Sequence, residues 1–224
     1  MAQGKGEKYN MNCKPALLIG GKSSRMGKNK GLLNRSGQPL GQYLADLLQA
    51  ETGEQPVLLG EGDIGLNTSH YRCLPDPEKG RGPLAGLVSF IQAYPDSNLI
   101  LLPTDLYAMD ATALSWMIQQ ARQAEKPVLW PKQPQRKHGE PLAAVYRKEA
   151  FPTLLDAWNK GKKSPCQAIP HAMRLEPEIP ESLRLAFVNI NTPEELEAVK
   201  RGLKQQFEPG DRQLLFPGST KRAH

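Results

Sequence analysis

The sequence predicts an α/β fold, a three-layer α/β/α sandwich around a mostly parallel sheet. Short apolar runs at 16–19, 56–60 and 98–102 are typical of buried strands. Segments with the apolar period of a helix lie between these runs, and parallel strands need such crossover connections. This alternation of strands and helices along the chain predicts the layered architecture.

The chain length suits one domain. With 224 residues the chain can bury a substantial core, but it is short for two domains. We assign 15–204 to the domain. We expect 1–14 to form a flexible amino-terminal tail and 205–224 a mobile carboxyl-terminal tail, because both ends are polar or rich in turn residues.

The composition argues against several classes of protein. No apolar run approaches the roughly 18 residues that span a bilayer, and the first residues lack the apolar stretch of a secretory signal. The three cysteines are widely spaced and form no CxxC pair. This favours a reducing, cytoplasmic setting without a structural zinc site. We therefore expect no membrane partner.

The charge predicts an anionic partner. The net charge is +6, and seven Lys or Arg residues but no Asp or Glu occur from Lys8 to Ala45. The chain has no recognisable nucleic-acid-binding motif and no arginine-rich arm. A phosphorylated small molecule explains this local clustering better than nucleic acid does.

The first strand, 16–19, ends at two glycines. Gly20 and Gly21 can adopt positive φ and bring backbone N–H groups close to a ligand. Hydroxyls and cations follow, namely Lys22, Ser23, Ser24, Arg25, Lys28 and Lys30. Together they predict a concave cradle for a triphosphate, although the glycine spacing fits neither the P-loop nor the GxGxxG turn. The alternative is an ordinary turn with a solvated basic flank.

Helices and strands then alternate. Residues 42–50 have the period of an amphipathic helix, and the strand at 56–60 would lie beside the first strand in a right-handed βαβ unit. A weaker strand is predicted at 70–74, and a helix at 84–93. In the loop before this helix, Asp76 alone could be a turn residue.

The most apolar strand, 98–102, leads to Asp105. A carboxylate at the carboxyl end of a central strand lies where α/β sheets bind ligands. Opposite a glycine-rich cradle, this carboxylate is a candidate ligand for Mg²⁺, which prefers oxygen. The alternative is that Asp105 caps the following turn.

The remaining chain continues the pattern. Predicted elements are a helix at 111–124, a strand at 128–130, a proline- and cation-rich loop at 131–139, a strand within 140–146 and a helix at 151–158.

The last block alternates like a strand over 186–190. After it, Thr192 can cap a helix whose first turn holds Pro193 and two acidic residues. Structural capping does not explain the two asparagines, Asn189 and Asn191, at the end of the strand.

The opening motif resembles that of the nucleotidyltransferases. The matching segments are Leu18-Ile19-Gly20-Gly21, Ser24-Arg25-Met26-Gly27 and Lys30-Gly31-Leu32-Leu33. They look most like the MobA-like molybdenum cofactor guanylyltransferases. Further blocks at 76–86, 98–105 and 186–195 resemble the same family. The chain departs from the family pattern at Ile19, Asn29, Thr104 and Tyr107.

The resemblance implies a Rossmann-like nucleotidyltransferase domain at 15–204, and an enzyme that transfers GMP from GTP to the phosphate of molybdenum-molybdopterin and releases pyrophosphate. Its implied partners are GTP, the molybdopterin cofactor, and molybdoenzymes or their chaperones. The implied catalytic residues are Arg25, Lys30 and Asp105. The implied nucleotide-binding residues are Leu18, Ile19, Gly20, Gly21, Lys30, Asp76 and Asp105. The implied Mg²⁺ ligand is Asp105, with Asn191 as a second candidate ligand and Asn189 as a substitute for it.

Two alternatives stay open at this point. One is a transferase that moves CMP or another nucleotide to a pterin or a sugar phosphate. The other is a non-catalytic paralogue that binds GTP or the cofactor and delivers it to a partner enzyme.

Overall fold

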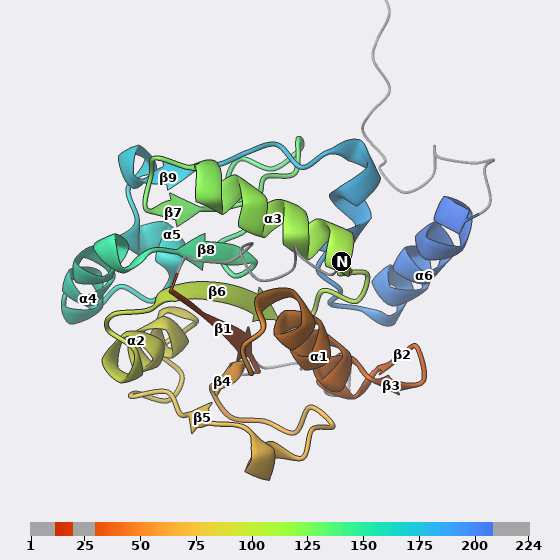
Figure 1. Cartoon of the computed structure of the whole chain (residues 1–224), viewed down its shortest axis with the longest axis horizontal. Helices are drawn as coiled ribbons and strands as arrows, with labels where there is room; N and C mark the ends of the chain where they lie inside the picture. Colours follow the sequence, from red (N-terminus) through yellow and green to blue (C-terminus); the bar gives the residue numbers. More distant parts are fainter. Residues whose placement is uncertain (1–11, 20–29, 208–224) are drawn as a thin grey trace, which may run out of the picture.

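A seven-stranded sheet forms the middle of the molecule (Figure 1). The computed structural model describes residues 12–19 and 30–207. The strand order is β5-β4-β1-β6-β8-β7-β9. The strands are β1 (Cys13–Leu18), β4 (Val57–Leu59), β5 (Cys73–Leu74), β6 (Asn98–Pro103), β7 (Val128–Leu129), β8 (Ala144–Tyr146) and β9 (Arg174–Leu175). β8 runs antiparallel to both its neighbours, and the other pairs are parallel. The predicted mostly parallel sheet is confirmed.

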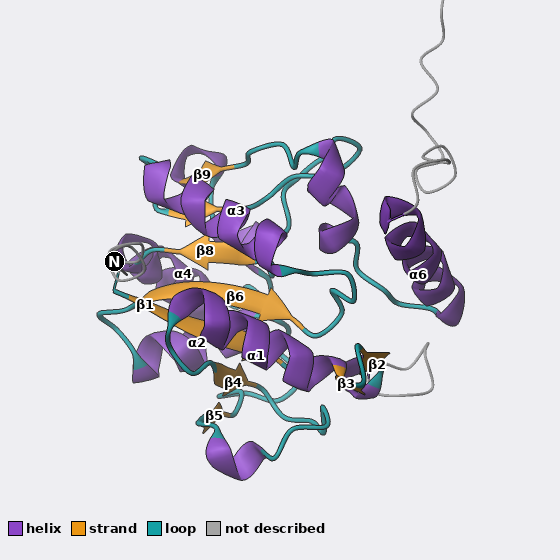
Figure 2. Cartoon of the chain, turned by 45° about the vertical axis from the view of Figure 1, so that its right-hand side comes forward, coloured by secondary structure: helices purple, strands orange, loops and turns teal. Residues whose placement is uncertain are grey.

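Helices cover both faces of this sheet (Figures 1 and 2). The helices are α1 (Leu40–Thr52), α2 (Leu84–Ala93), α3 (Ala111–Gln123), α4 (Phe151–Asn159), α5 (Pro165–Ala168) and α6 (Pro193–Phe207). Leu17 of β1 packs in one buried apolar layer with α1 and α3. Its neighbours Ala16 and Leu18 pack in the other layer with α2 and α4. Because successive side chains of a strand point to opposite faces, one apolar run supplies both layers, and the predicted three-layer sandwich is confirmed.

Short elements connect these layers. They are the 3-10 turns η1 (Lys30–Leu32), η2 (Thr68–His70), η3 (Lys148–Ala150), η4 (His171–Met173) and η5 (Glu181–Phe187), and a hairpin of β2 (Asn34–Arg35) and β3 (Gln38–Pro39). β1 lies between β4 and β6 and pairs in parallel with both. The three strands therefore end at one edge, which we call the carboxyl edge of the sheet.

The strand expected at 186–190 is wrong. The chain forms η5 up to Phe187 and then irregular backbone. Phe187 packs edge-on against Trp116 of α3, with 5.8 Å between ring centroids. Ile190 is fully buried, and its N–H donates to the carbonyl of Asp105 at 2.9 Å. The alternating apolar residues therefore reflect burial of one side of a non-strand segment.

Two other strands are shorter than expected. The segment 70–74 contributes only β5, because Thr68–His70 forms η2, whose Asn67 cap accepts a hydrogen bond from the N–H of Ser69. In the segment 140–146 the strand begins only at Ala144. Pro141 has no N–H for a ladder, and its carbonyl accepts from the Tyr146 hydroxyl at 2.6 Å.

The structured part extends slightly beyond 15–204. β1 begins at Cys13, and α6 continues to Phe207. Within 12–19 and 30–207, no helix is both long and apolar enough to cross a bilayer.

A smaller side chain in the core part of β6 should lower the stability of the fold. Leu101 of β6 is fully buried, so Leu101→Ala is expected to lower the free energy of unfolding by about 2–5 kcal/mol through lost burial and a residual cavity. Leu32→Ala is the matched control, because the Leu32 side chain is 46% exposed and should change stability by less than about 0.5 kcal/mol. Urea unfolding at 25 °C measures both, and equal losses would contradict this description of the core.

Candidate functional site

Three polar side chains meet at the carboxyl edge although they are far apart in the sequence. Lys30 is the first residue of η1, Asp105 follows β6, and Asn191 precedes α6. The Nζ of Lys30 lies 3.3 Å from Oδ2 of Asp105 and donates to Oδ1 of Asn191 at 2.9 Å. This Lys30–Asp105–Asn191 cluster brings together three of the residues that the sequence singled out.

Close backbone packing positions Lys30. The next residue, Gly31, is pressed against Ile64, where an added Cβ would lie 2.5 Å from the Ile64 Cβ. The N–H of Leu33 donates to the carbonyl of Lys30 at 3.1 Å. Tyr107 donates its hydroxyl to the carbonyl of Asn34 at 2.9 Å. The turn that carries Lys30 is thus attached to the loop that carries Asp105.

A capping box positions Asn191. The N–H of Glu195 donates to the hydroxyl oxygen of Thr192 at 3.2 Å. In return, the Glu195 carboxylate accepts from the N–H groups of Thr192 at 3.2 Å and Asn191 at 2.5 Å. The predicted Thr192 cap is confirmed, and its carboxylate partner also fixes the backbone of Asn191.

The Asp105 carboxylate is mostly buried and only partly paired. Burial raises its pKa, and the nearby ammonium of Lys30 offsets part of this effect. Its Oδ1 is buried without a hydrogen-bond partner in the described structure. A buried carboxylate oxygen without a donor is costly for the fold, so this atom is suited to a ligand. The alternative role of Asp105 as a turn cap leaves this oxygen unexplained.

The donor set fits Mg²⁺. Asp105 Oδ1 and the amide oxygen of Asn191 are hard oxygen ligands of the kind this ion prefers. Among the described residues, no group of three or more His, Cys, Asp or Glu could hold a metal ion. Mg²⁺ often uses one or two protein ligands and takes the rest from phosphate and water.

Asp76 lies at another part of the same edge, just after β5. An added Cβ on Gly86 would lie 2.9 Å from Leu18 Cδ1 and 3.9 Å from Asp76 Oδ1, so the start of α2 brings these two predicted residues together. Burial, followed by the charge of Glu61, raises the pKa of Asp76. Ile19 is also buried here, and its N–H donates to the carbonyl of Leu59 at 2.9 Å.

The middle of the predicted cradle lies outside the described residues. Gly20, Gly21 and Arg25 fall between Ile19 and Lys30, so the structure describes only the two ends of the cradle.

Sequence reasoning missed Glu140. The Nδ2 of Asn189 donates to Oε2 of Glu140 at 3.4 Å, so Asn189 contacts this carboxylate and is not part of the Lys30–Asp105–Asn191 cluster. Glu140 opens the segment predicted to return to the sheet, but this local position alone does not single it out.

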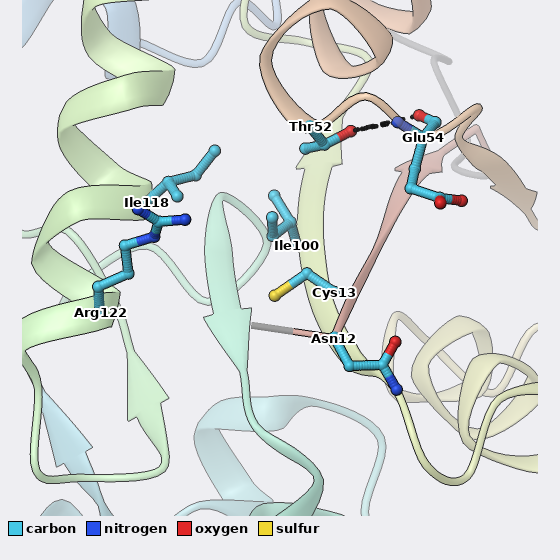
Figure 3. A pocket seen from close by; sticks show the side chains of 7 residues that line it. All are labelled: Asn12, Cys13, Thr52, Glu54, Ile100, Ile118 and Arg122. Carbon is cyan, nitrogen blue, oxygen red and sulfur yellow. Dashed lines mark hydrogen bonds between the residues drawn. The ribbon is translucent and has the colours of Figure 1, made fainter. Parts of the chain in front are cut away.

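A cavity of about 170 Å³ lies at the opposite edge, beside the start of β1 (Figure 3). Its lining residues are Asn12, Cys13, Thr52, Glu54, Ile100, Ile118 and Arg122. Burial raises the pKa of the Cys13 thiol to about 11, so this thiol stays protonated and is a poor nucleophile.

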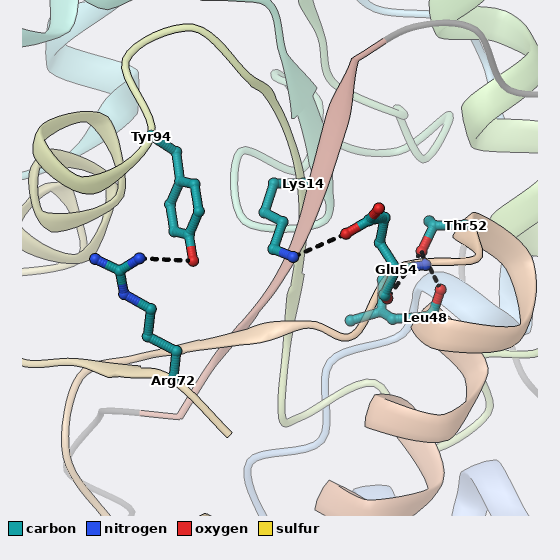
Figure 4. Close-up of polar contacts among 6 residues, drawn as sticks. All are labelled: Lys14, Leu48, Thr52, Glu54, Arg72 and Tyr94. Carbon is teal, nitrogen blue, oxygen red and sulfur yellow. Dashed lines mark hydrogen bonds and ion pairs between the residues drawn. The ribbon is translucent and has the colours of Figure 1, made fainter. Parts of the chain in front are cut away.

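Structural contacts surround this opposite edge. Glu54 pairs with Lys14 at 2.9 Å, and Thr52 donates to the carbonyl of Leu48 at 2.6 Å (Figure 4). The Lys14–Glu54 pair joins β1 to the residues just after α1, and the Thr52 bond lies within the last turn of α1. The cavity therefore lies at the amino edge of the sheet, away from the Lys30–Asp105–Asn191 cluster.

Comparisons with known proteins identify relatives over most of the chain. The family described as the MobA-like NTP transferase domain matches residues 16–172. A molybdenum cofactor guanylyltransferase of Pseudomonas fluorescens is 32% identical over 190 residues, which cover 83% of this chain and 92% of that protein. A molybdenum cofactor biosynthesis bifunctional protein of a Synechocystis species is 33% identical over 181 residues. The match covers 80% of this chain and 51% of that protein, so this chain spans about half of that relative.

Solved structures show the same fold. The molybdopterin-guanine dinucleotide biosynthesis protein A of Archaeoglobus fulgidus has a TM-score of 0.66 at 23% identity, covering 86% of this chain and 99% of the other. A putative protein of Aquifex aeolicus has a TM-score of 0.68 at 21% identity, covering 86% and 100%.

The raised pKa of Asp105 predicts a stability cost in the absence of ligand. Because the folded-state pKa lies above that of the unfolded chain, this cost is absent below about pH 4 and grows as the pH rises through the folded-state value. Asp105→Asn keeps the shape without the charge. We expect it to be more stable than the parent at pH 8, with a difference that shrinks towards pH 4.

Urea unfolding without divalent ions measures this difference. The matched control is Asp156→Asn, because Asp156 is exposed and pairs only with Lys160 among the described residues. A lower stability of Asp105→Asn at pH 8 would mean that attraction to Lys30 outweighs the burial of the carboxylate.

Proposed function

Because this chain belongs to the MobA-like NTP transferase family and is a nucleotidyltransferase, we propose that it transfers GMP from GTP to the phosphate of molybdenum-molybdopterin. The products are the guanine dinucleotide form of the cofactor and pyrophosphate. The observation that carries this proposal is the convergence of Lys30, Asp105 and Asn191 at the carboxyl edge, where α/β sheets bind nucleotides. The similarity to molybdenum cofactor guanylyltransferases supports GTP and molybdopterin as the substrates.

The chain's own residues divide the work of this reaction. Lys30 Nζ lies between Asp105 Oδ2 and Asn191 Oδ1. It would place a positive charge next to the triphosphate. Asp105, whose Oδ1 has no hydrogen-bond donor among the described residues, would hold Mg²⁺ together with Asn191. Bound there, Mg²⁺ would supply positive charge to the phosphates as pyrophosphate leaves.

The proposed transfer needs no covalent intermediate with the enzyme. An oxygen of the acceptor's phosphate attacks the α-phosphorus, and the bond between that phosphorus and the bridging oxygen of pyrophosphate breaks with its electron pair. A phosphate oxygen is already deprotonated at neutral pH, so no general base is required. Lys30 and Arg25 would neutralise the negative charge of the phosphates, and positioning and charge stabilisation are sufficient for such a displacement.

We assign the nucleoside to the part of the edge formed by β5, β4 and β1. Asp76, Leu18 and Ile19 lie there, and Gly20 and Gly21 follow directly along the chain. Asp105 follows β6, the next strand in the order. The α-phosphate would then lie between the nucleoside and the rest of the sheet.

We also propose a cytoplasmic setting, in which molybdoenzymes or their chaperones receive the product. In this proposal, delivery of the cofactor follows the guanylyl transfer that the similarity to molybdenum cofactor proteins supports.

A nucleotide screen separates this function from its alternatives. The protein is incubated with Mg²⁺, molybdenum-molybdopterin and each NTP in turn, and pyrophosphate release and product mass are measured. Of the NTPs tested, only GTP should give a product. A CMP or AMP adduct would identify a different transferase, and GTP binding without pyrophosphate release would identify a non-catalytic paralogue.

Asp105→Asn should lower turnover by at least ~100-fold, the scale expected when a principal source of transition-state charge stabilisation is lost. Turnover is measured as pyrophosphate release at saturating GTP. Asp156→Asn again serves as the control and should keep parental turnover, because Asp156 lies exposed on α4. Near-normal turnover of Asp105→Asn with an unchanged Mg²⁺ requirement would make Asp105 a turn cap.

Lys30→Ala should weaken GTP binding by roughly 1.5–3 kcal/mol, the value of a hydrogen bond to a charged group. The control is Lys79→Ala, since the Lys79 side chain is 81% exposed and its pairing with Glu61 should contribute under about 1 kcal/mol. Calorimetric titration of GTP compares them. Equal small losses would mean that this surface attracts anions diffusely, without a specific contact from Lys30.

A further inference from the structure

Glu140 stands at the same edge of the sheet as Asp105. β8 pairs antiparallel with β6 through Leu101↔Ala144, Ile100↔Val145 and Leu99↔Tyr146. Four steps beyond Leu101 along the chain is Asp105, and four steps before Ala144 is Glu140. Asp105 and Glu140 both lie beyond the Leu101↔Ala144 pair and on the same side of it, so the two acidic residues stand at the same edge of the sheet. The charge of Asp105 also contributes to the raised pKa of Glu140, which agrees with this placement.

The backbone around Glu140 is fixed on both sides. Gly139 lies against Trp130, where an added Cβ would be 2.3 Å from the Trp130 carbonyl oxygen. The N–H of Glu140 donates to the carbonyl of Pro131 at 2.8 Å. On the other side, the carbonyl of Pro141 accepts from the Tyr146 hydroxyl at 2.6 Å. Such support is expected of a residue that must present its side chain in one position.

The carboxylate of Glu140 can accept more hydrogen bonds than the described residues donate to it. Within the described structure, its one hydrogen-bond donor is Asn189 Nδ2, at the long distance of 3.4 Å, and it forms no ion pair. Burial is the largest cause of its raised pKa, and Arg136 and Asn189 act in the opposite direction. A half-buried carboxylate of this kind is best satisfied by a ligand that brings N–H donors.

The strand order separates the two substrates. Along the strand order β5-β4-β1-β6-β8, Asp76 follows β5, Asp105 follows β6, and Glu140 precedes β8. With the nucleoside beside Asp76 and the reacting phosphate beside Asp105, the part of the edge beyond Asp105 is left for the acceptor.

On the basis of the proposed function, we propose that Glu140 recognises the aminopyrimidinone edge of the acceptor's pterin. This edge carries two adjacent donors, the ring N3–H and the 2-amino group, and a carboxylate can accept from both at once. Guanine has the same pair of donors, but we place it beside Asp76, on the other side of Asp105 from Glu140. Glu140 would therefore be a specificity residue for the acceptor, separate from the residues that hold the nucleotide.

The test compares pterin with lumazine, which has a 2-oxo group in place of the 2-amino group. Each heterocycle is used as an inhibitor of GMP transfer to molybdenum-molybdopterin by the full chain. The parent protein should be inhibited at least about tenfold more strongly by pterin, because a site built for an N–H donor rejects an analogue that lacks it. Equal inhibition of the parent would overturn the proposal without any variant.

Glu140→Gln then tests the residue itself. The variant should raise the KM for the acceptor by about 10- to 100-fold, the range for loss of a charged hydrogen bond, and leave the Kd for GTP within about twofold of the parent. Its amide offers one donor and one acceptor, which match lumazine, so the preference for pterin should disappear or reverse. Glu149→Gln is the matched control, because Glu149 is exposed just beyond the other end of β8 and should change neither constant.

Other outcomes overturn the proposal. Weaker GTP binding together with a changed Mg²⁺ requirement would assign Glu140 to the metal site, and loss of discrimination between GTP and ITP would assign it to guanine. Lower stability with an unchanged pterin preference would make it a structural partner of Asn189. Failure of the parent to form any product from GTP and acceptor would instead contradict the proposed function.

Discussion

The parallel pairing of β1 with β6 is the constraint on which the rest of the molecule depends. It extends through six residue pairs, from Cys13↔Asn98 to Leu18↔Pro103. Because the two strands end level, the chain leaves them at the same edge and carries Ile19 and Asp105 to neighbouring positions. Every other strand of the seven-stranded sheet is added outward from this pair, and each face of the pair is covered by its own layer of helices.

The Lys30–Asp105–Asn191 cluster places a charged group at this edge at some cost to the fold. Asp105 is mostly buried, one of its oxygens has no donor among the described residues, and its pKa is raised. A sequence optimised for stability alone would place a neutral or fully paired side chain there. The surrounding supports, namely Gly31 against Ile64, the Tyr107 hydroxyl and the Thr192–Glu195 capping box, are neutral or exposed contacts that hold this charged centre in place.

The sequence was sufficient for the parts of the fold that depend on local pattern. The helix at 84–93 matches α2 at both ends because Pro83 and the apolar period mark it, and Asp105 was found because it follows the most apolar strand. The segment 186–190 was misassigned because one-sided burial against α3 gives an irregular segment the alternation of a strand. Glu140 was missed because the antiparallel pairing of β8 with β6 brings it to the edge where Asp105 lies, and no local pattern encodes that pairing.

The position of Asn191 has a consequence for the newly synthesised chain. The segment that matches the family ends at residue 172, and Asn191 is held by a cap whose carboxylate belongs to the first turn of α6. During translation, β1, Lys30 and Asp105 leave the ribosome well before that turn exists. A nascent chain can therefore form the sheet and its two charged residues, but it lacks the amide that completes the cluster. Synthesis itself thus delays assembly of the full Lys30–Asp105–Asn191 cluster until nearly the whole domain has emerged.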